Sequence, residues 1–231
     1  MNLQKYKNDG WGLSEKAFQN IFDILNNMNP PINIIDFGSG HSTEFLYDYK
    51  IKAKKDIYID SFDDSKEYMH SKATLVPLVE CSNKNFDKMI SKKKLLPDLL
   101  KIKTTPVTTR QKNCFYDLSD ITLKENYNLV LLDGPNGNGR SMAFLHLIDR
   151  LDKGAIVFID DTQACDRKYN YDFCGIFNSI FDAEELISNE YDNQDSFKIF
   201  RITGPNKNTD TIINRITLYY KYRFKRLKYY F

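Results

Sequence analysis

Five aspartates follow four short apolar runs of the sequence, and their type and spacing suit the binding of a polar ligand. Asp36 ends INIID, Asp60 ends DIYID, Asp133 ends YNLVLLD, and Asp160 and Asp161 end AIVFIDD. One such aspartate would be explained as a helix cap or a turn residue. The carboxyl ends of parallel strands, however, meet at one edge of a sheet, where ligands bind. Five carboxylates at four strand ends therefore predict a site at that edge.

The segment DFGSGHST places two glycines directly after the first apolar run. At Gly38 and Gly40 an approaching ligand meets no Cβ, and the backbone N–H groups of residues 39–43 suit a carboxylate at a helix start. Asp36 beside them is suited to an ammonium group. Thr43 occupies the third glycine position of the dinucleotide fingerprint, which disfavours a nicotinamide cofactor, and no Gly-Lys-Ser/Thr follows to form a phosphate loop.

A ligand with an amino-acid end and a ribose needs a second acidic residue about 20 positions further on, which accepts both ribose hydroxyls. Asp60 lies at that distance, and Asp63 is the alternative because the end of the strand is not fixed by sequence. An amino acid, a ribose and no phosphate together describe S-adenosylmethionine. An NAD-dependent reductase is the competing interpretation, although no Tyr-x-x-x-Lys pair follows the fourth strand.

The elements that must position these residues alternate between strands and helices. A helix is predicted from Ser14 up to the Pro30–Pro31 pair, and further helices are predicted around 44–49, 61–71, 141–151 and 176–181. Strands are predicted at 32–36, 56–60, 73–79, 127–133 and 155–161, with an antiparallel hairpin formed by 196–204 and 213–222. This order predicts an α/β Rossmann-like fold, with helices on both faces of a seven-stranded, mostly parallel sheet.

Length and composition predict a single domain that spans residues 1–231. Within it we distinguish an N-terminal helical extension (1–30), a lysine-rich insertion (81–113) and a basic aromatic tail (219–231). The net charge of +2, from 33 Lys and Arg against 31 Asp and Glu, does not favour nucleic acid as a partner. The four cysteines form no C-x-x-C pair, and neither a secretory signal nor a membrane-spanning stretch is evident, so a cytoplasmic location is expected.

The segments INIIDFGSGHSTEFL, YNLVLLDGPNGNGR and AIVFIDD resemble strand motifs of class I S-adenosylmethionine-dependent methyltransferases. The Asp-Gly-Pro turn, the arginine after it and the later Asp pair resemble the sugar and polysaccharide O-methyltransferases, including the macrocin type. The resemblance implies the following cofactor contacts: Asp36, Gly38, Ser39, Gly40 and Thr43 to the methionine end, Asp60 to the ribose, and Tyr116 or Asp117, in CFYDL, to the adenine. Packing of the CFYDL aromatics in the core is the alternative.

The same resemblance implies that Asp133, Asp160 and Asp161 hold a divalent cation, with Asp133 and Asp160 27 residues apart. Oxygen ligands suit Mg²⁺, which would lower the pKa of a substrate hydroxyl. Alternatively, Asp133 lies beside the sulfonium while Asp160 and Asp161 cap a helix or orient a hydroxyl. Without a metal, the base must be sought elsewhere, and His41 in the glycine loop is the first candidate. Arg140 is interpreted either as a contact to an anionic substrate or as part of a surface ion pair.

We expect from these residues an O-methyltransferase for a small hydroxylated molecule, with a sugar or glycan unit as first choice. The catalytic candidates are Asp133, His41 and Asp160. A cofactor-binding protein without transferase activity is the alternative. The tail, with five basic and seven aromatic residues, is expected to contact a partner subunit, as in a homo-oligomer, or alternatively an anionic membrane surface.

Overall fold

The computed structural model describes residues 1–6, 12–80, 114–135, 140, 142–162, 173–192 and 195–204. The insertion at 81–113, the tail at 219–231 and the strand predicted at 213–222 lie outside the described residues, so these predictions are not tested. In the described part of the chain, no helix has the length and apolar character needed to cross a bilayer.

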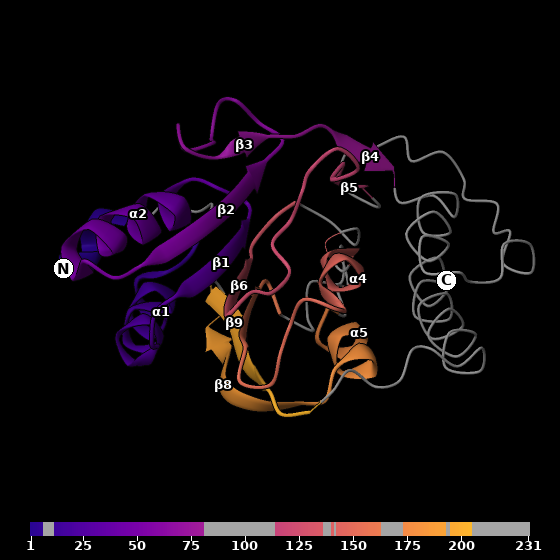
Figure 1. The fold of residues 1–231 in the computed structure, drawn as a ribbon. Coiled ribbons are helices and arrows are strands. Elements are labelled where there is room, and N and C mark those ends of the chain that lie inside the picture. The colour runs from indigo at the N-terminus through magenta and orange to yellow at the C-terminus, as the bar shows by residue number, and fades with distance from the viewer. Residues whose placement is uncertain are drawn as a thin grey trace, which may run out of the picture.

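A seven-stranded sheet forms the centre of the molecule, in the order β3-β2-β1-β6-β7-β9-β8 (Figure 1). All pairings from β3 to β7 are parallel, and β9 runs antiparallel to both of its neighbours. The strands of this sheet are β1 (Ile32–Phe37), β2 (Ile57–Asp63), β3 (Thr74–Leu75), β6 (Leu129–Leu132), β7 (Ile156–Asp160), β8 (Ala183–Asp192) and β9 (Asp195–Ile202). The predicted Rossmann-like architecture is confirmed.

The antiparallel hairpin consists of different residues from those predicted. It pairs β8 with β9, and β9 pairs with β7 on its other side. The predicted pairing of 196–204 with 213–222 is therefore wrong, because both sides of β9 are occupied. The sequence of β8, AEELISNEYD, is acidic, and the register shifts between Glu185 and Ile187. A bulge at that point breaks the two-residue alternation by which a strand is predicted from sequence.

Two further predictions around β2 need correction. The segment 73–79 does not form one strand, because β3 ends before Pro77 and β4 (Leu78–Glu80) pairs with β5 (Cys114–Tyr116) in a separate antiparallel ribbon. Proline has no N–H to donate and interrupts the ladder. The helix predicted at 61–71 is absent from the structure, since β2 continues to Asp63 and the chain then forms turns.

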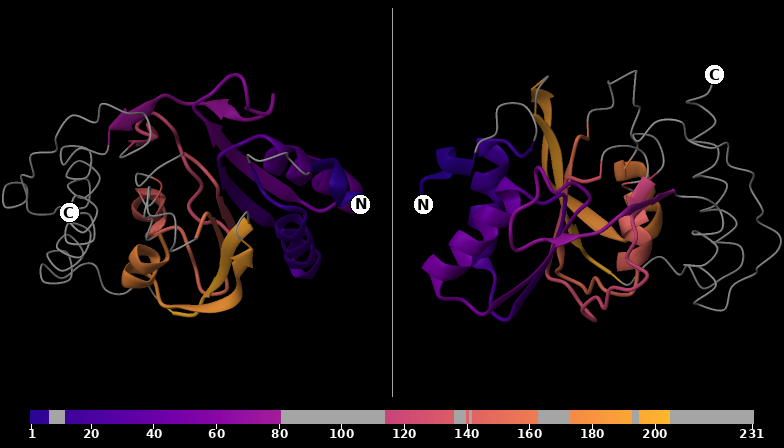
Figure 2. Two further views of the ribbon diagram at one scale, coloured as in Figure 1. Left: turned by 180° about the vertical axis from the view of Figure 1, so that it is seen from behind. Right: turned by 90° about the horizontal axis from the view of Figure 1, so that it is seen from above.

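Helices cover both faces of the sheet, as Figures 1 and 2 show. On one face lie α1 (Glu15–Asn27), α2 (His41–Ala53) and the short 3-10 helix η1 (Leu3–Tyr6), and on the other lie α4 (Ala143–Leu147) and α5 (Phe173–Ile180). The predicted start of the first helix is confirmed, because the Ser14 side chain accepts a hydrogen bond from the Ala17 N–H at 3.1 Å.

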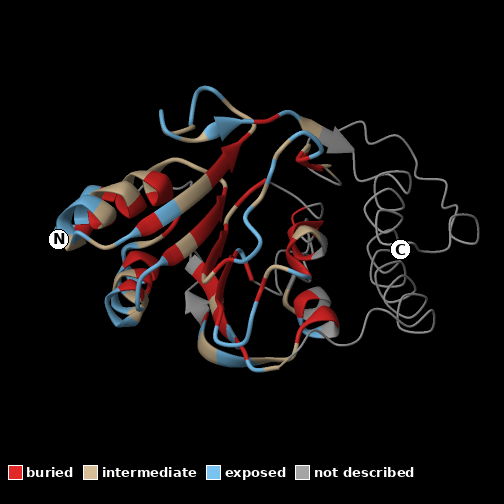
Figure 3. Ribbon diagram, in the orientation of Figure 1, coloured by how far each residue is buried: buried red, intermediate tan, exposed pale blue. Residues whose placement is uncertain are grey.

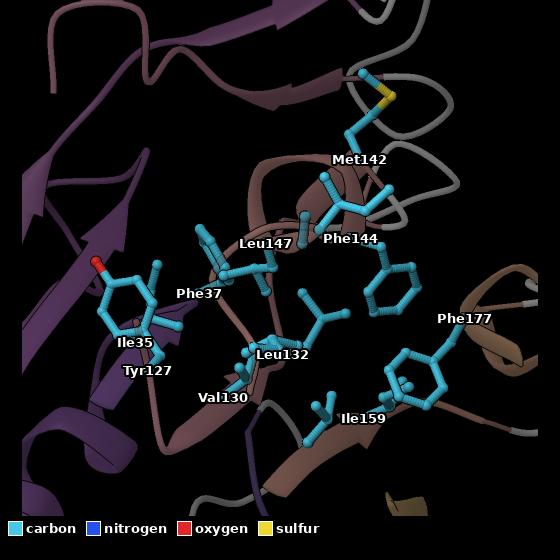
Figure 4. Close-up of a cluster of buried hydrophobic side chains, with 14 of the residues drawn as sticks. Ile35, Phe37, Tyr127, Val130, Leu132, Met142, Phe144, Leu147, Ile159 and Phe177 are labelled. Carbon is cyan, nitrogen blue, oxygen red and sulfur yellow. The ribbon is translucent and has the colours of Figure 1, made fainter. Parts of the chain in front are cut away.

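Alternate residues of each central strand belong to two separate cores. Ile34, Leu131 and Phe158 pack in the cluster under α1 and α2. Ile35 and Val130 pack in the other cluster, under α4 and α5, and Figure 4 shows this second cluster. Figure 3 shows the central strands as almost entirely buried. The sheet is therefore packed on both faces, and this packing fixes the positions of the strand ends at its carboxyl edge.

Candidate functional site

The glycine bend after β1 packs directly against the turn after β6. The Gly38 N–H donates to the Phe62 carbonyl at 3.0 Å, and Gly38 has a φ of +97°. A Cβ on Gly38 would lie 2.6 Å from the Gly134 nitrogen, which no side chain can tolerate. Two of the predicted motifs, the glycine loop and the Asp-Gly-Pro turn, are thus in backbone contact at the carboxyl edge of the sheet.

The amino end of α2 has no side-chain cap. Its N-cap residue is Gly40, with a φ of +129°, whereas α1 is capped by the side chain of Ser14. A Cβ on Gly40 would approach the Tyr68 carbonyl oxygen to 3.4 Å, so the turn after β2 lies against this bend. The first N–H groups of an uncapped helix carry partial positive charge and bind carboxylates.

Asp36 lies fully buried beneath this helix end. Its Oδ2 accepts hydrogen bonds from Thr43 Oγ1 at 2.7 Å, Ser42 Oγ at 3.0 Å and Ser61 Oγ at 3.3 Å. Its Oδ1 is buried and has no hydrogen-bond partner among the described residues. Burial raises the pKa of Asp36 to about 7. Thr43, predicted to contact the methionine end, directs its hydroxyl to Asp36, and Oδ1 is the acceptor left for an ammonium group.

The acidic residue at the end of β2 is Asp63, not Asp60. Asp60 lies opposite Ile35, three residues before the end of the strand, and accepts hydrogen bonds from the Tyr127 and Tyr58 hydroxyls. Asp63 accepts a hydrogen bond from Ser39 Oγ at 3.3 Å, and burial raises its pKa. The strand boundary predicted from sequence was therefore three residues short, and the alternative residue occupies the position next to the glycine bend.

Tyr116 and Asp117, the two candidates for an adenine contact, differ in exposure. Tyr116 is buried and stacks on Phe37, with ring centroids 6.1 Å apart, and its hydroxyl would clash with a Cβ on Gly134. Asp117 is half-buried and accepts a hydrogen bond from the Ser119 N–H at 3.1 Å. Tyr116 thus packs as a core residue, and Asp117 is the more accessible of the two.

The three aspartates at the ends of β6 and β7 come together, as expected for residues at the carboxyl ends of neighbouring parallel strands. One carboxylate oxygen from each of Asp133, Asp160 and Asp161 lies within 4.8 Å of the other two. The parallel pairing of Leu132 with Ile159 brings the two strand ends side by side. Burial raises the pKa of Asp133 to about 6 and that of Asp160 well above its usual value, and the two carboxyls are hydrogen-bonded to each other.

Arg140 is not a surface residue, in contrast to one of the two interpretations from sequence. Its side chain is 2 % exposed and its Nη1 lies 3.0 Å from Asp161 Oδ2. Its Nε donates to the Pro135 carbonyl at 3.1 Å, and Nη1 also lies 3.4 Å from the Asp160 carbonyl oxygen. The sequence offered only one signal for this role, namely an arginine shortly after a strand-end aspartate.

The histidines are not part of this acidic cluster in the described residues. His41 Nδ1 lies 3.5 Å from Glu44 Oε2 of its own helix, and its side chain is 42 % exposed. His146 stacks on Phe115, and the His70 N–H donates to Ser39 Oγ. The role of His41 as a base stays a prediction, which no contact in the described structure supports.

An open depression of about 520 Å³ lies at the opposite edge of the sheet from these residues. Phe181, Asp182, Phe200 and Gly204 line it, where α5 meets the hairpin. The residues of the candidate site are not among its lining residues, so it is a separate feature of the surface.

Comparison with known proteins identifies no family and adds a distant structural likeness. No protein-family model and no curated protein matches the sequence. A solved structure named "putative rRNA-methylase from Clostridium thermocellum" aligns with 81 % of this chain and 96 % of its own, at 13 % identity and a TM-score of 0.43. That likeness is too distant to carry an argument.

The strand order itself is that of a methyltransferase-like Rossmann fold. Five parallel strands, with β1 in the middle, are followed by a reversed strand inserted between the fifth strand and the last. This arrangement places the ends of β1, β2, β6 and β7 at one edge, where open α/β sheets bind their ligands.

Proposed function

We propose that the chain binds S-adenosylmethionine at the carboxyl edge of its sheet and transfers the methyl group to a hydroxyl of a small molecule, with a sugar or glycan unit as first choice. The observation that carries this proposal is the glycine bend, which adjoins an uncapped helix start on one side and the terminal carboxylate of β2 on the other. These groups match an amino acid and a ribose, and no phosphate loop is present in the sequence.

The residues of the bend fit the cofactor on two observations. Asp36 Oδ1 is a buried acceptor without a partner among the described residues, which suits the methionine ammonium group. The N–H groups at the start of α2 suit the methionine carboxylate. We assign the ribose hydroxyls to Asp63, because it ends β2 where Asp60 does not.

Methyl transfer is an in-line displacement at a sulfonium carbon, and it requires alignment and a nucleophile more than covalent catalysis. In this proposal the protein aligns the acceptor hydroxyl over the ends of β6 and β7. When no cation is bound, Asp133 of the hydrogen-bonded Asp133–Asp160 pair accepts the hydroxyl proton at a carboxylate oxygen, and its pKa of about 6, raised by burial, suits a base that works near neutral pH.

We further propose that Asp133, Asp160 and Asp161 hold a divalent cation. Three carboxylates with oxygens within 4.8 Å of one another form a hard donor set of the kind that Mg²⁺ prefers, and Asp161 is exposed. A bound cation would supply a Lewis acid for the acceptor hydroxyl.

Calorimetric titration with S-adenosylmethionine and with NAD, each with and without Mg²⁺, tests the proposal. We expect S-adenosylmethionine to bind and NAD not to bind. Binding of NAD without binding of S-adenosylmethionine would contradict the proposal and favour an NAD-dependent reductase. Binding of S-adenosylmethionine without methylation of any hydroxylated acceptor in a broad sugar panel would favour a non-catalytic binding protein.

A further inference from the structure

We propose that Arg140 is the resident counter-ion of the acidic cluster and that it sets how tightly the cluster takes a divalent cation. This inference rests on the cation part of the proposed function. It goes beyond that proposal because it concerns the affinity of the site and a residue that is not a ligand.

The guanidinium is fixed by contacts on both sides of the cluster. Nε donates to the Pro135 carbonyl in the turn after β6, and Nη1 contacts the Asp160 carbonyl and the Asp161 carboxylate at the end of β7. Asp161 itself has a left-handed backbone, with a φ of +54°. Arg140 therefore bridges the two loops that carry the three carboxylates.

The position of the charge matters as much as the contacts. Once a divalent cation has displaced the proton shared by Asp133 and Asp160, three carboxylates and one guanidinium carry a net charge of −2, which that cation neutralises. Arginine cannot lose its proton in a protein, so this positive charge is permanent. Because the side chain is 2 % exposed, water screens it poorly, and it repels any cation bound to the same carboxylates.

Two roles for Arg140 predict opposite changes in cation affinity when this residue is replaced. A residue that only holds Asp161 in place would, when removed, leave a looser site that binds cations more weakly. A resident counter-ion would, when removed, leave a more negative site that binds them more tightly. The Coulomb energy between a buried unit charge and a divalent ion is larger than the effect of orienting one exposed carboxylate. We therefore expect the affinity for cations to rise when Arg140 is replaced by an uncharged residue.

The test is Mn²⁺ binding to the full chain, measured by electron paramagnetic resonance of the free ion. We expect Arg140→Met to bind Mn²⁺ at least tenfold more tightly than the wild type, and Arg140→Lys, which keeps the charge, to stay within about threefold of the wild type. The matched control is Arg201→Met, because Arg201 forms a surface ion pair with Glu184 at 2.9 Å on the hairpin. That variant should leave Mn²⁺ affinity unchanged.

Equal or weaker Mn²⁺ binding by Arg140→Met would overturn the inference. If Arg140→Met folds only with Mn²⁺, as followed by circular dichroism, that result supports it. If Arg140→Met does not fold even with Mn²⁺, Arg140→Gln replaces it in the same titration, with the same criterion. Binding of S-adenosylmethionine, titrated separately for each variant, distinguishes failure of the proposed function from failure of the inference about Arg140. A wild type that does not bind S-adenosylmethionine contradicts the proposed function, whatever the Mn²⁺ result.

Discussion

The aspartates of the candidate site differ in their burial and in their partners. Asp36 is enclosed and held by three hydroxyls, Asp63 lies beside the glycine bend, and Asp160 is buried against Asp133. Asp161, a direct neighbour of Asp160 in the sequence, is exposed and paired with Arg140. Residues of one type, at similar positions after strands, thus have different surroundings: Asp36 and Asp63 lie at the glycine bend, and Asp133, Asp160 and Asp161 form the acidic cluster.

The buried carboxyl of Asp36 makes the stability of the protein depend on pH. The folded-state pKa of Asp36 is about 7, above the 3.8 of the unfolded chain, so the folded protein retains a proton that the unfolded chain loses. Its contribution to stability is fully present below about pH 4 and falls as the pH rises towards 7. The loss is about 1.4 kcal/mol per pH unit at most.

Urea denaturation of the wild type and Asp36→Asn at pH 5, 6 and 7 measures this effect. The free energy of unfolding of the wild type, relative to that of Asp36→Asn, should fall as the pH rises from 5 to 7. Asp56→Asn, at an exposed site before β2, is the control and should parallel the wild type. A constant difference between Asp36→Asn and the wild type across this range would contradict the prediction.

Removal of single carboxylates from the acidic cluster tests the proposed cation. Asp160→Ala and Asp161→Ala should each abolish Mg²⁺-dependent methylation, because each removes one of three clustered carboxylates. Turnover of an acceptor found in the sugar panel gives the measurement. Asp152→Ala, at an exposed position, should retain the activity. Wild-type activity that persists unchanged in a chelator would exclude a role for the cation.

At the scale of elements, the site depends on close approaches between backbones. The bend after β1 contacts the turn after β6 at Gly38 and Gly134, and both Asp133 and Gly134 donate their N–H groups to the Phe37 carbonyl. Only residues without a Cβ permit this contact. The spacing of the glycine loop and the cluster of aspartates is therefore set by two glycines rather than by the charged residues themselves.

Gly38→Ala should destabilise the fold and abolish binding of S-adenosylmethionine. Its φ is +97° and its new Cβ would lie 2.6 Å from the Gly134 nitrogen, so a left-handed strain and a backbone clash add together. Gly154→Ala provides a matched control, because Gly154 has a φ of +96° and a Cβ there would meet nothing within 4 Å.

The control variant should lose only about 1–2 kcal/mol, the cost of a left-handed backbone at a residue with a side chain. Gly38→Ala should lose clearly more than that. Chemical denaturation and calorimetry of both variants give the comparison. Equal losses, or cofactor binding retained by Gly38→Ala, would show that the bend can relax and is not required in this form.

At the scale of the whole molecule, two cores hold one sheet. The central strands are buried on both faces, and aromatic side chains occupy each core, including Phe158 against Phe197 and Phe144 against Phe177. Because the site lies at the edge of the sheet, its geometry should survive a moderate loss of packing in either core.

Phe158→Ala should lower the free energy of unfolding by about 3–5 kcal/mol, since it empties a fully buried position in the core under α1 and α2. Affinity for S-adenosylmethionine should stay unchanged at temperatures where the variant is folded. Ile51→Ala, at a side chain that is 67 % exposed on α2, should change stability by less than about 0.5 kcal/mol. A loss of affinity in folded Phe158→Ala would indicate that core and site are coupled.

Local patterns in the sequence predict the layered fold and the meeting of the strand-end aspartates. Alternating apolar runs and amphipathic segments determine the order of strands and helices, and a parallel sheet brings the ends of its strands to one edge. The cap at Ser14, the glycine bend and the grouping of Asp133 with the Asp160–Asp161 pair all follow from such short-range signals.

Features that depend on contacts between residues distant in the sequence are seen only in the folded molecule. The extension of β2 to Asp63, the division of 73–79 at Pro77 and the pairing of the bulged strand β8 are set by neighbouring strands. The burial of Arg140 depends on carbonyl and carboxylate groups from two loops. Sequence patterns record the preference of each segment for a layer. The environment of a charge is set by groups that are remote in the chain, and only the folded molecule brings these together.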